Sequence, residues 1–263
     1  MDTHILNKNV VAVIMAGGLG KRMETNIPKV LVEVNGIPMI VRIIQTLKHL
    51  SYNLNLEKII IVVGKYSDQI TDVINSLTDL PKIVYVKQEI SLGTGHALMC
   101  CKNELLQNPE SDVLILSGDV PMLSVDTMLR LISLSANVKL ITTKIDNPTG
   151  YGRIILKDEI FEKIVEHADC NEEQIQVSQI NSGIYCIKSK LLCNNFKYLK
   201  NKNKQIEYYL TDMIEIIQKK EKVNVDILNI DSENVFEILG VNTIEQLKEL
   251  EKIIFIKNKK IEI

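Results

Sequence analysis

Residues 16–22, AGGLGKR, place three glycines and two cations directly after a run of apolar residues. Glycines allow backbone N–H groups to approach an anion closely, and Lys21 and Arg22 would neutralise its charge. The spacing does not fit the dinucleotide fingerprint G-x-G-x-x-G or the Walker loop G-x-x-x-x-G-K-[ST]. Two interpretations stay open: a tight turn with a solvated basic pair, and an anion-binding loop.

Oxygen donors and a further cation occur at other turns. Asp119 follows an apolar run in SGDVP, and Asn242 lies in LGVNT. Mg²⁺ prefers one or two protein oxygens together with substrate phosphates, so both side chains are candidate metal ligands. Each also has an ordinary explanation, Asp119 as a turn residue and Asn242 as a helix N-cap or turn residue. Lys29 is either a solvated surface charge or a further phosphate contact.

Gln88, in VKQEI, is a candidate for base recognition. Its amide offers an acceptor beside two donors, which suits the N3–H and carbonyl of uracil. A flipped amide would suit cytosine, so backbone groups near Gly93 are expected to decide between the two bases. His96 lies just inside the following helix, and we expect it to be structural.

The chain contains no G-x-S-x-G, no H-E-x-x-H and no cluster of His and Cys with metal-ligand spacing. A phosphate that attacks another phosphate is already ionised near neutral pH and needs no general base. Such a reaction requires alignment and charge neutralisation, which glycines, cations and one metal-binding Asp would supply.

Short apolar runs alternate with helical patterns in the first half of the chain. The expected strands are 10–14, 59–63, 83–86, 113–116 and 138–143, and the expected helices are 39–50, 67–77, 94–106 and 124–134, with Ser67 and Thr94 as N-caps. This alternation predicts a parallel sheet covered by helices on both faces. Ligands bind outside the carboxyl ends of such strands, where the glycine loop, Gln88 and Asp119 are expected to meet.

The regular alternation of strand and helix patterns ends near NPTGYGRI, residues 147–154. The pattern predicts strands at 153–156, 160–165, 180–187 and 223–230, and helices at 190–199, 208–219 and 243–256. We therefore expect an α/β fold with a Rossmann-like, mainly parallel sheet, in which the second half forms a smaller, lid-like substrate region.

Bulk properties restrict the class of protein. The chain has 263 residues, 46% hydrophobic and 24% charged, and a net charge of −2, which gives no general attraction to nucleic acid or anionic membrane. It has no apolar run of about 18 residues and no signal-peptide pattern. Its five cysteines include no C-x-x-C pair, so we expect neither a disulfide framework nor a zinc site, and a cytoplasmic location.

Several motifs together resemble one family. AGGLGKRM and IPKVLVEVNGIPM resemble the opening of the sugar-1-phosphate nucleotidylyltransferases. The stretches QEISLGTGHA, LSGDVPMLS, NPTGYGRI, IVEHADCNEEQ, INSGIY and EYYLTDMIE are similar to its N-acetylglucosamine-1-phosphate uridyltransferase (UDP-N-acetylglucosamine pyrophosphorylase) branch. In bacteria that domain is the N-terminal half of a bifunctional enzyme. The resemblance extends from about Val10 to Glu251.

The resemblance implies a set of site residues and a reaction. It implies that the nucleotide is bound by Ala16, Gly17, Gly18, Arg22, Lys29, Gln88, Gly93, Thr94, Gly118 and Asp119. It implies that the amino sugar is bound by Gly152, Glu166, Asn181 and Asn242, and that Mg²⁺ is held by Asp119 and Asn242. The implied catalytic residues are Arg22, Lys29 and Asp119. The implied reaction converts UTP and N-acetylglucosamine 1-phosphate into UDP-N-acetylglucosamine and pyrophosphate.

The resemblance also implies a domain plan of the nucleotide-diphospho-sugar transferase type. We expect an extension at 1–9, a nucleotidyltransferase domain at 10–256 and a tail at 257–263. Within the domain, 10–146 would form the nucleotide-binding half, 147–241 the sugar-binding half and 242–256 the C-terminal helix. No left-handed β-helix is expected, because nothing after Ile256 would encode it. We therefore expect a monomer or a weak dimer that acts on small molecules.

Two departures from the family pattern keep alternatives open. Lys21 replaces the usual Thr of the loop, and Ser117 stands where relatives often carry Tyr. The same fold would also suit another sugar 1-phosphate or nucleotide, or a catalytically silent module that senses sugar nucleotides. The joint presence of Arg22, Lys29, Asp119 and Asn242 favours catalysis, because a silent module is expected to lose some of them.

Overall fold

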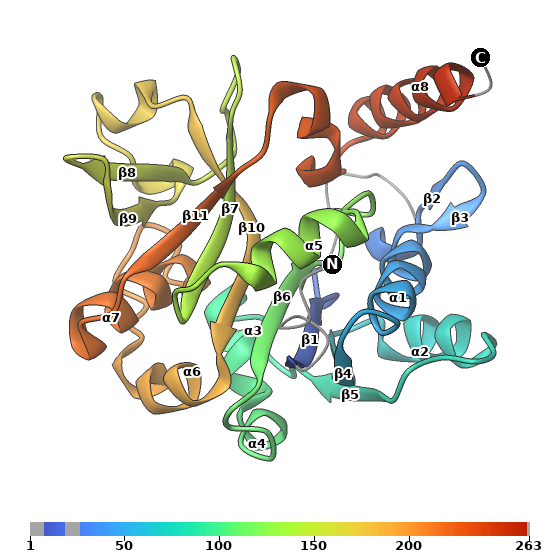
Figure 1. Ribbon diagram of the computed structural model, residues 1–263, viewed down its shortest axis with the longest axis horizontal. Helices are drawn as coiled ribbons and strands as arrows, with labels where there is room; N and C mark the ends of the chain where they lie inside the picture. The colour runs from blue at the N-terminus through green and yellow to red at the C-terminus, as the bar shows by residue number, and fades with distance from the viewer. Residues whose placement is uncertain (1–7, 19–26, 262–263) are drawn as a thin grey trace.

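A computed structural model of the chain describes residues 8–18 and 27–261, the last four of them by backbone alone, so Lys21 and Arg22 lie outside the described residues. Within these ranges a nine-stranded mixed sheet forms the centre of the molecule, and helices cover both of its faces (Figure 1). The strands are β1 (Asn9–Met15), β2 (Glu33–Val34), β3 (Ile37–Pro38), β4 (Asn55–Val63), β5 (Ile83–Lys87), β6 (Asp112–Ser117), β7 (Val138–Lys144), β8 (Arg153–Lys157), β9 (Ile160–Val165), β10 (Gln179–Lys188) and β11 (Val225–Asn229). The helices are α1 (Met39–Leu50), α2 (Ser67–Asn75), α3 (Thr94–Cys100), α4 (Lys102–Leu105), α5 (Val125–Ser133), α6 (Ser189–Asn195), α7 (Leu210–Glu221) and α8 (Ile244–Ile261).

The order of the strands is β11-β7-β10-β6-β1-β4-β5, with β8 and β9 attached to β10. The pairs β1–β4, β1–β6, β4–β5 and β7–β11 are parallel, which confirms the predicted mainly parallel sheet. Strand β10 runs antiparallel between β6 and β7, and the attached strands β8 and β9 also pair antiparallel. Parallel connections require a crossover, whereas β10 comes directly after the β8–β9 hairpin and enters the sheet in the opposite direction.

The central strand β1 shows why the sheet strands are apolar along their whole length. Val10, Ala12 and Ile14 face a core layer built with α1, α2 and α5. Val11 and Val13 face a second layer built with α3, α6 and α7. Successive strand residues point to opposite faces, so a sheet covered on both sides requires apolar residues at every position.

The predicted helices and strands are present, but several of their details are wrong. The C-terminal helix predicted over 243–256 continues to Ile261, into the stretch expected to be a tail. Helix α2 begins at Ser67 itself with Tyr66 as its N-cap, and α3 begins at Thr94 with Gly93 as its N-cap. Thr94 is not free to cap α3, because its hydroxyl accepts a hydrogen bond from the backbone of Leu210. The helix predicted over 94–106 is divided into α3 and α4 by a turn at Cys101.

A short hairpin of β2 and β3 was not predicted. Asn35 and Gly36 form its turn, with positive φ angles of 47° and 74°, a backbone conformation that Asn and Gly adopt more readily than other residues. Val34 of this hairpin packs with Leu250 and Ile254 of α8 in a third, smaller core cluster. The C-terminal helix is therefore attached to the domain by one of its sides, and Figure 1 shows its end extending away from the sheet.

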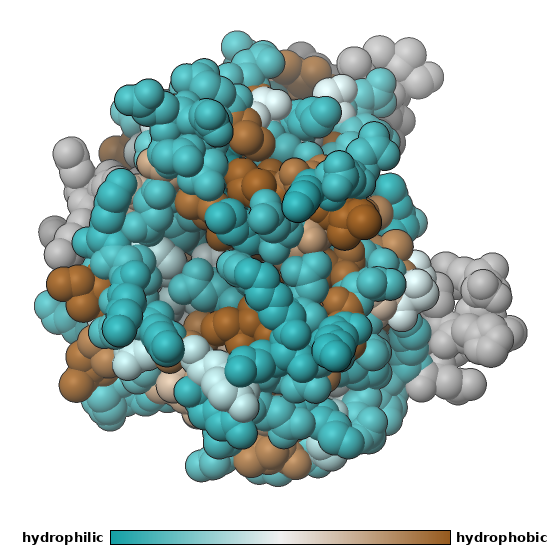
Figure 2. Space-filling model, turned by 90° about the vertical axis from the view of Figure 1, so that its left-hand side faces the viewer, coloured by the Kyte–Doolittle hydropathy of each residue, from teal (hydrophilic) through white to brown (hydrophobic). Residues whose placement is uncertain are grey.

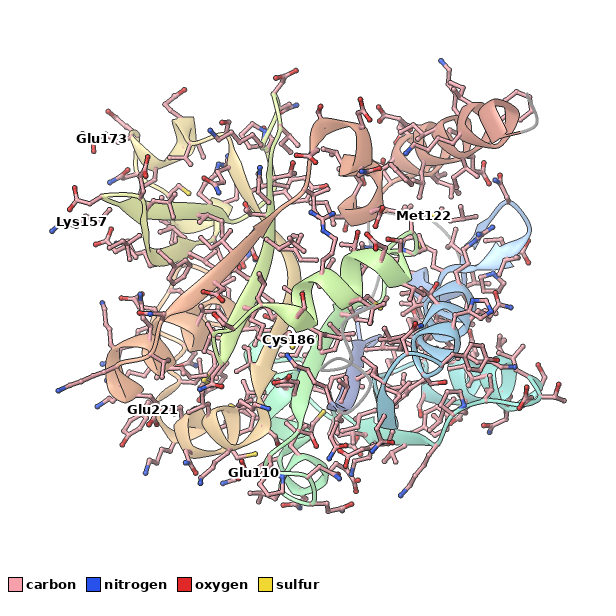
Figure 3. The ribbon with its side chains drawn as sticks, in the orientation of Figure 1. Glu110, Met122, Lys157, Glu173, Cys186 and Glu221 are labelled. Carbon is pink, nitrogen blue, oxygen red and sulfur yellow. The ribbon has the colours of Figure 1, made fainter. Side chains whose placement is uncertain are left out.

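All five cysteines carry free thiols, as expected from their number and spacing: Cys100, Cys101, Cys170, Cys186 and Cys193. Figure 3 shows Cys186 inside the molecule at the sheet, whereas Lys157 and Glu173 lie at the outer rim. None of the helices in the described ranges has the length and apolar character that crossing a bilayer requires.

Candidate functional site

The carboxyl ends of β1, β5 and β6 open into one cleft. The backbone N–H of Ala16 after β1 donates to Val62 O in β4 at 2.9 Å, and that of Gly118 after β6 donates to Met15 O at 3.0 Å. A pocket of about 240 Å³ lies above these ends, which we call the central cleft. The side chains and backbone that line it come from Met15, Gly17, Gly18, Lys29, Val30, Gln88, Ser91, Gly93, Thr94, Ala97, Ser117, Asp119 and Glu207.

Glycines are required where these strand ends meet. A Cβ on Gly118 would lie 2.7 Å from the carbonyl oxygen of Met15, and one on Gly64 would lie 2.8 Å from that of Gly17. Contacts this close force backbone to move, so a side chain at either position would separate the strand ends that form the floor of the cleft. A Cβ on Gly18, in contrast, meets no atom of the described residues within 4 Å.

One side of the cleft holds a cation between two oxygen donors. The Lys29 ammonium donates to Asp119 Oδ2 and, at 2.7 Å, to Asn242 Oδ1. The other carboxylate oxygen of Asp119 accepts from the Ser117 hydroxyl at 2.5 Å. The Lys29 and Asp119 side chains are only 12% and 17% exposed, so water screens this ion pair less than a surface pair.

The Asp119 and Asn242 segments are also joined through their backbones. Val241 N donates to the carbonyl oxygen of Asp119 at 2.9 Å, which brings the start of α8 to the end of β6. At that start, Thr243 Oγ1 accepts from Gln246 N at 3.3 Å, while the side-chain oxygen of Asn242 faces Lys29. Because Lys29 is only 12% exposed and donates to Asp119 and Asn242, its interpretation as a solvated surface charge is wrong.

The opposite side of the cleft holds Gln88, which is 7% exposed and follows β5. Its amide nitrogen lies 3.1 Å from the carbonyl oxygen of Gly93 and 3.0 Å from Nδ1 of His96. The backbone N–H of Gln88 donates to Val63 O at 2.8 Å, which extends the pairing of β5 with β4. Gln88 is therefore held at both ends, by Val63 at its backbone and by Gly93 and His96 at its amide.

The start of α7 packs against the turn that contains Gly93. Tyr208 N donates to Leu92 O at 2.8 Å, and Gly95 N donates to Tyr208 O at 2.7 Å. A Cβ on Gly93, whose φ is +104°, would lie 2.6 Å from Tyr208 O, and one on Gly95 would lie 2.9 Å from it. Both glycines are therefore needed for the close approach of the two segments.

Three further residues of the predicted site form a second group: one directly before β8, one directly after β9 and one in β10. Asn181 N donates to the carbonyl oxygen of Gly152 at 2.9 Å, and a Cβ on Gly152 would lie 3.5 Å from Oε2 of Glu166. The amide of Asn181 donates to the Tyr185 hydroxyl at 2.7 Å. The Thr211 hydroxyl donates to Glu166 Oε1 at 2.9 Å, so this group is tied to α7 and through it to the Gly93 turn.

The carboxyl of Glu166 titrates in an unusual environment. Burial raises its pKa above the ordinary range, and the hydrogen bond from Thr211 opposes that change. Asp169 and Glu207 raise the pKa further, because each adds negative charge nearby. A ligand hydroxyl or N–H group that reaches Glu166 would therefore form its hydrogen bond with little competition from water.

The structure brings the predicted residues into two groups. One residue predicted to bind the sugar, Asn242, lies with the group that lines the central cleft. Gly17, Gly18, Lys29, Gln88, Gly93, Thr94 and Asp119 line the central cleft, with Ala16 and Gly118 at its floor. Gly152, Glu166 and Asn181 form the second group, whereas Asn242 contacts Lys29 and so lies with the first. Arg22 lies outside the described residues.

Sequence reasoning missed several contributors. Ser117, Thr211 and Tyr185 hold Asp119, Glu166 and Asn181 by side-chain hydrogen bonds. His96, expected to be structural, faces the Gln88 amide. The motifs EYYLTDMIE and INSGIY contain Thr211 and Tyr185, but a single sequence gives no indication that these side chains turn toward the site.

Comparisons with known proteins agree with this geometry. A family model described as the MobA-like NTP transferase domain matches residues 12–176. A protein of Acanthamoeba polyphaga mimivirus, named probable UDP-N-acetylglucosamine pyrophosphorylase, is 40% identical over 245 residues, which cover 91% of this chain and 94% of the relative. The bifunctional protein GlmU of Clostridium botulinum (strain 657 / Type Ba4) is 40% identical over 246 residues, 91% of this chain and 51% of the relative, so the chain spans about half of that protein.

A similar solved structure is the 2.76 Å crystal structure of a putative glucose-1-phosphate thymidylyltransferase from Bacillus anthracis in complex with a sucrose. The two share a TM-score of 0.69 and 20% sequence identity, over 92% of this chain and 94% of the other. At that level of identity the likeness shows the fold, which is an α/β sheet with helices on both faces.

Proposed function

Since this chain belongs to the sugar-phosphate nucleotidyltransferases, we propose that its central cleft transfers UMP from UTP to N-acetylglucosamine 1-phosphate and releases pyrophosphate. The observation that carries the proposal is the meeting, in one cleft, of a buried base-reading amide with a cation between two oxygen donors. The names of the relatives from mimivirus and Clostridium botulinum support the choice of product, UDP-N-acetylglucosamine.

The chemistry is an in-line attack of the sugar phosphate on the α-phosphate of UTP. The attacking phosphate oxygen already carries negative charge, so no side chain has to remove a proton from it. The bond from the α-phosphorus to the bridging oxygen breaks, and pyrophosphate leaves with the electron pair. The enzyme therefore has to align the two phosphates and neutralise charge, which is the part we assign to Lys29, the backbone of Gly17 and Gly18, and Arg22.

The oxygen donors beside Lys29 fit a magnesium ion. Asp119 Oδ2 and Asn242 Oδ1 already face one cation, the Lys29 ammonium, from two sides. One carboxylate and one amide oxygen are donors that Mg²⁺ accepts, and substrate phosphates and water would supply its other ligands. We assign the metal to Asp119 and Asn242; when bound, it would supply neutralisation of negative charge on the phosphates. Ser117 would keep the Asp119 carboxylate turned toward it through their hydrogen bond.

Gln88 is the residue that we assign to the base. Its amide lies within the lining of the central cleft, on the side away from Lys29 and Asp119, and Gly93 and Thr94 line the same part. A hydrogen bond to a buried amide discriminates strongly, because a base that fails to form it leaves polar groups unpaired.

Gly152, Glu166 and Asn181 are the residues that we assign to the amino sugar. Gly152 is buried between the other two, and a Cβ at this position would lie 3.5 Å from Asn181 Cβ and 3.5 Å from Glu166 Oε2, so the absence of a side chain lets these two groups lie close together. Glu166 would accept a hydrogen bond from a sugar hydroxyl or from the acetamido N–H. Its own contact with Thr211 fixes one oxygen and leaves Oε2 on the Gly152 side.

The test is a screen for pyrophosphate release with four nucleoside triphosphates against several sugar 1-phosphates, each with Mg²⁺. We expect the pair of UTP and N-acetylglucosamine 1-phosphate to give the highest kcat/KM. A higher kcat/KM for another pair would assign the cleft to a different substrate of the same family. Absence of pyrophosphate release from every pair would contradict catalysis and favour a sensing module.

A further inference from the structure

The orientation of the Gln88 amide follows from its two neighbours. The carbonyl oxygen of Gly93 can only accept a hydrogen bond, so the group 3.1 Å away from it is the amide nitrogen of Gln88. Nδ1 of His96 lies 3.0 Å from that same nitrogen and must therefore also accept. This assigns the neutral imidazole with its proton on Nε2.

Both N–H groups of Gln88 are consequently used inside the protein. The atom left for a ligand is Oε1, which lies on the side of Gly17, where a Cβ would approach it to 3.3 Å. Gly17 and Gln88 both line the central cleft, so this acceptor faces the space for the base. A base read by Oε1 must present a donor. With position 3 of the pyrimidine against Oε1, uracil presents N3–H as a donor, whereas N3 of cytosine is an acceptor that would place a lone pair against a lone pair. Cytosine could offer its N4 amino group to Oε1 only by shifting its ring in the cleft.

The Gly93 carbonyl alone would fix the orientation of the Gln88 amide less firmly. It already accepts a hydrogen bond from Ala97 N at 3.1 Å, and it engages only one of the two N–H groups of Gln88. A rotation of the amide would then sacrifice one bond and could present an N–H to cytosine. With His96 in place the same rotation sacrifices two bonds and sets Oε1 against the Gly93 carbonyl, and a bond to His96 is regained only if the imidazole proton moves from Nε2 to Nδ1, so the penalty at this buried site is larger.

His96 is itself held in position. It lies in the first turn of α3, which is anchored by the hydrogen bond from Gly95 N to Tyr208 O at 2.7 Å. Its ring lies beside that of Tyr208, with 6.3 Å between the ring centroids. The acceptor Nδ1 is thus presented from a fixed backbone and a packed ring, and not from a mobile surface side chain.

We infer that His96 is a positioning residue for base selection, which locks the Gln88 amide so that the cleft accepts uracil and rejects cytosine. This inference rests on the proposed function of the cleft in nucleotide binding. It requires no contact between His96 and the nucleotide, because His96 acts through Gln88. It also gives the choice between the two bases to a side chain in addition to the backbone group at Gly93.

The experiment measures UTP and CTP binding to the whole protein by calorimetry, without sugar phosphate, and kcat/KM for both nucleotides with it. The variants are His96→Leu, which removes the acceptor at similar volume, and His96→Asn, which restores an acceptor close to the position of Nδ1. His49→Leu serves as the matched control, because His49 is an exposed histidine of α1. Thermal melting shows that each variant is folded.

We expect His96→Leu to lower the UTP-to-CTP ratio of affinities by about tenfold, mainly through weaker UTP binding, with the ratio of kcat/KM following it. His96→Asn should keep most of the wild-type ratio, and His49→Leu all of it. In a Gln88→Ala background the His96→Leu change should have no further effect on the ratio, because His96 acts only through the amide.

An unchanged ratio in folded His96→Leu would overturn the inference. So would independent, additive losses from Gln88→Ala and His96→Leu, or equal binding of UTP and CTP by the wild-type protein. A wild-type protein that prefers UTP in binding but turns over no substrate would contradict the proposed function, whereas the loss of that preference in His96→Leu would still support the inference.

Discussion

Asp119 divides its two carboxylate oxygens between a hydroxyl and an ammonium. Ser117 donates to one oxygen and Lys29 to the other, so the carboxylate has a fixed orientation at the end of β6. Asp119→Asn places an amide in this position and removes the charge that a divalent metal needs. We expect kcat to fall on the order of 10²- to 10³-fold, measured by pyrophosphate release in Mg²⁺.

A folded Asp119→Asn protein with near-normal turnover would contradict this assignment. Ser117→Ala provides a graded comparison, since it removes the neighbouring hydroxyl and keeps the carboxylate. Its effect should be smaller than that of Asp119→Asn, because it affects the orientation of the group and not its charge.

Lys29 stands between the two oxygens that we assign to the metal, so the two cations should compete in the free protein. Replacing Lys29 by Met removes the ammonium and leaves Asp119 Oδ2 and Asn242 Oδ1 available. We expect Mn²⁺ to bind the nucleotide-free Lys29→Met protein on the order of tenfold more tightly than wild type, measured by electron paramagnetic resonance of free Mn²⁺. Lys65→Met, at an exposed lysine before α2, should have no effect. Unchanged or weaker binding in Lys29→Met would contradict the competition.

At the residue scale, the sequence predicted the types of side chain at the site but not their pairing. Gln88 and Asp119 follow apolar runs, and the carboxyl ends of parallel strands share one edge, so their meeting could be predicted. The contact of Lys29 with Asn242 spans 213 positions, and no local pattern reports it. The contact of His96 with Gln88 spans only 8 positions, yet it depends on rotamers and a tautomer that residue types do not specify.

At the element scale, the cleft depends on the close contact between α3 and the start of α7. A Cβ on Gly95 would lie 2.9 Å from Tyr208 O and 3.0 Å from Tyr209 O, so Gly95→Ala should separate the two elements. We expect a loss of about 1–3 kcal/mol of stability in chemical denaturation, together with a higher KM for UTP. Gly18→Ala is the matched control for stability, because its Cβ meets nothing within 4 Å among residues 8–18 and 27–261. Equal stabilities of the two variants would show that the contact adapts without strain.

Helix α7 also carries a carboxyl whose ionisation opposes folding. Burial, followed by the charges of Glu215, Glu166 and Asp169, raises the pKa of Asp212 from 3.8 to about 6. Between these values the folded protein binds more protons than the unfolded chain, so this group makes stability fall as the pH rises from about 4 to about 6.

Asp212→Asn removes that titration. Its melting temperature relative to wild type should therefore rise across this pH range and stay level above it. The matched control is Asp72→Asn, at an exposed position of α2, whose difference from wild type should be independent of pH. If the difference in melting temperature between Asp212→Asn and wild type is also independent of pH, Asp212 titrates normally in the folded protein.

The order of strands and helices was largely predictable, because apolar runs and 3.6-residue patterns are strong local signals. The antiparallel direction of β10 was not, since a strand buried on both faces has the same apolar pattern in either direction. The caps at Ser67 and Thr94 were predicted wrongly for a related reason. A residue type that caps well also serves elsewhere, and the hydroxyl of Thr94 is used by Leu210 of α7.

At the scale of the whole molecule, the large apolar residues that are exposed in the described part of the chain come from several different elements. Figure 2 shows that hydrophilic residues cover most of the face formed by β8, β9 and α7, with hydrophobic residues between them. Helix α8 packs through Leu250 and Ile254 against the β2–β3 hairpin, while Phe255 and Ile256 are 59% and 46% exposed. The exposed side of α8 is therefore the surface that we would expect to support a dimer, if one forms.

We predict a monomer, or a weak dimer through α8, at micromolar concentration. Static light scattering should give a mass close to the 29.8 kDa of one chain. Replacing Phe255 and Ile256 together by Ser should remove any residual dimer and leave pyrophosphate release unchanged. A stable trimer, or a dimer that survives this double change, would reveal an assembly surface elsewhere on the molecule.

The central claim is that one cleft joins UMP to an amino-sugar phosphate. It is tested most directly by ³¹P nuclear magnetic resonance of a reaction that contains the protein, UTP, N-acetylglucosamine 1-phosphate and Mg²⁺. The account predicts that the two substrate signals decline together while UDP-N-acetylglucosamine and pyrophosphate appear in equal amounts, and that Asp119→Asn suppresses both products. Hydrolysis of UTP without a sugar nucleotide, or no change in the spectrum of the wild-type protein, would contradict it.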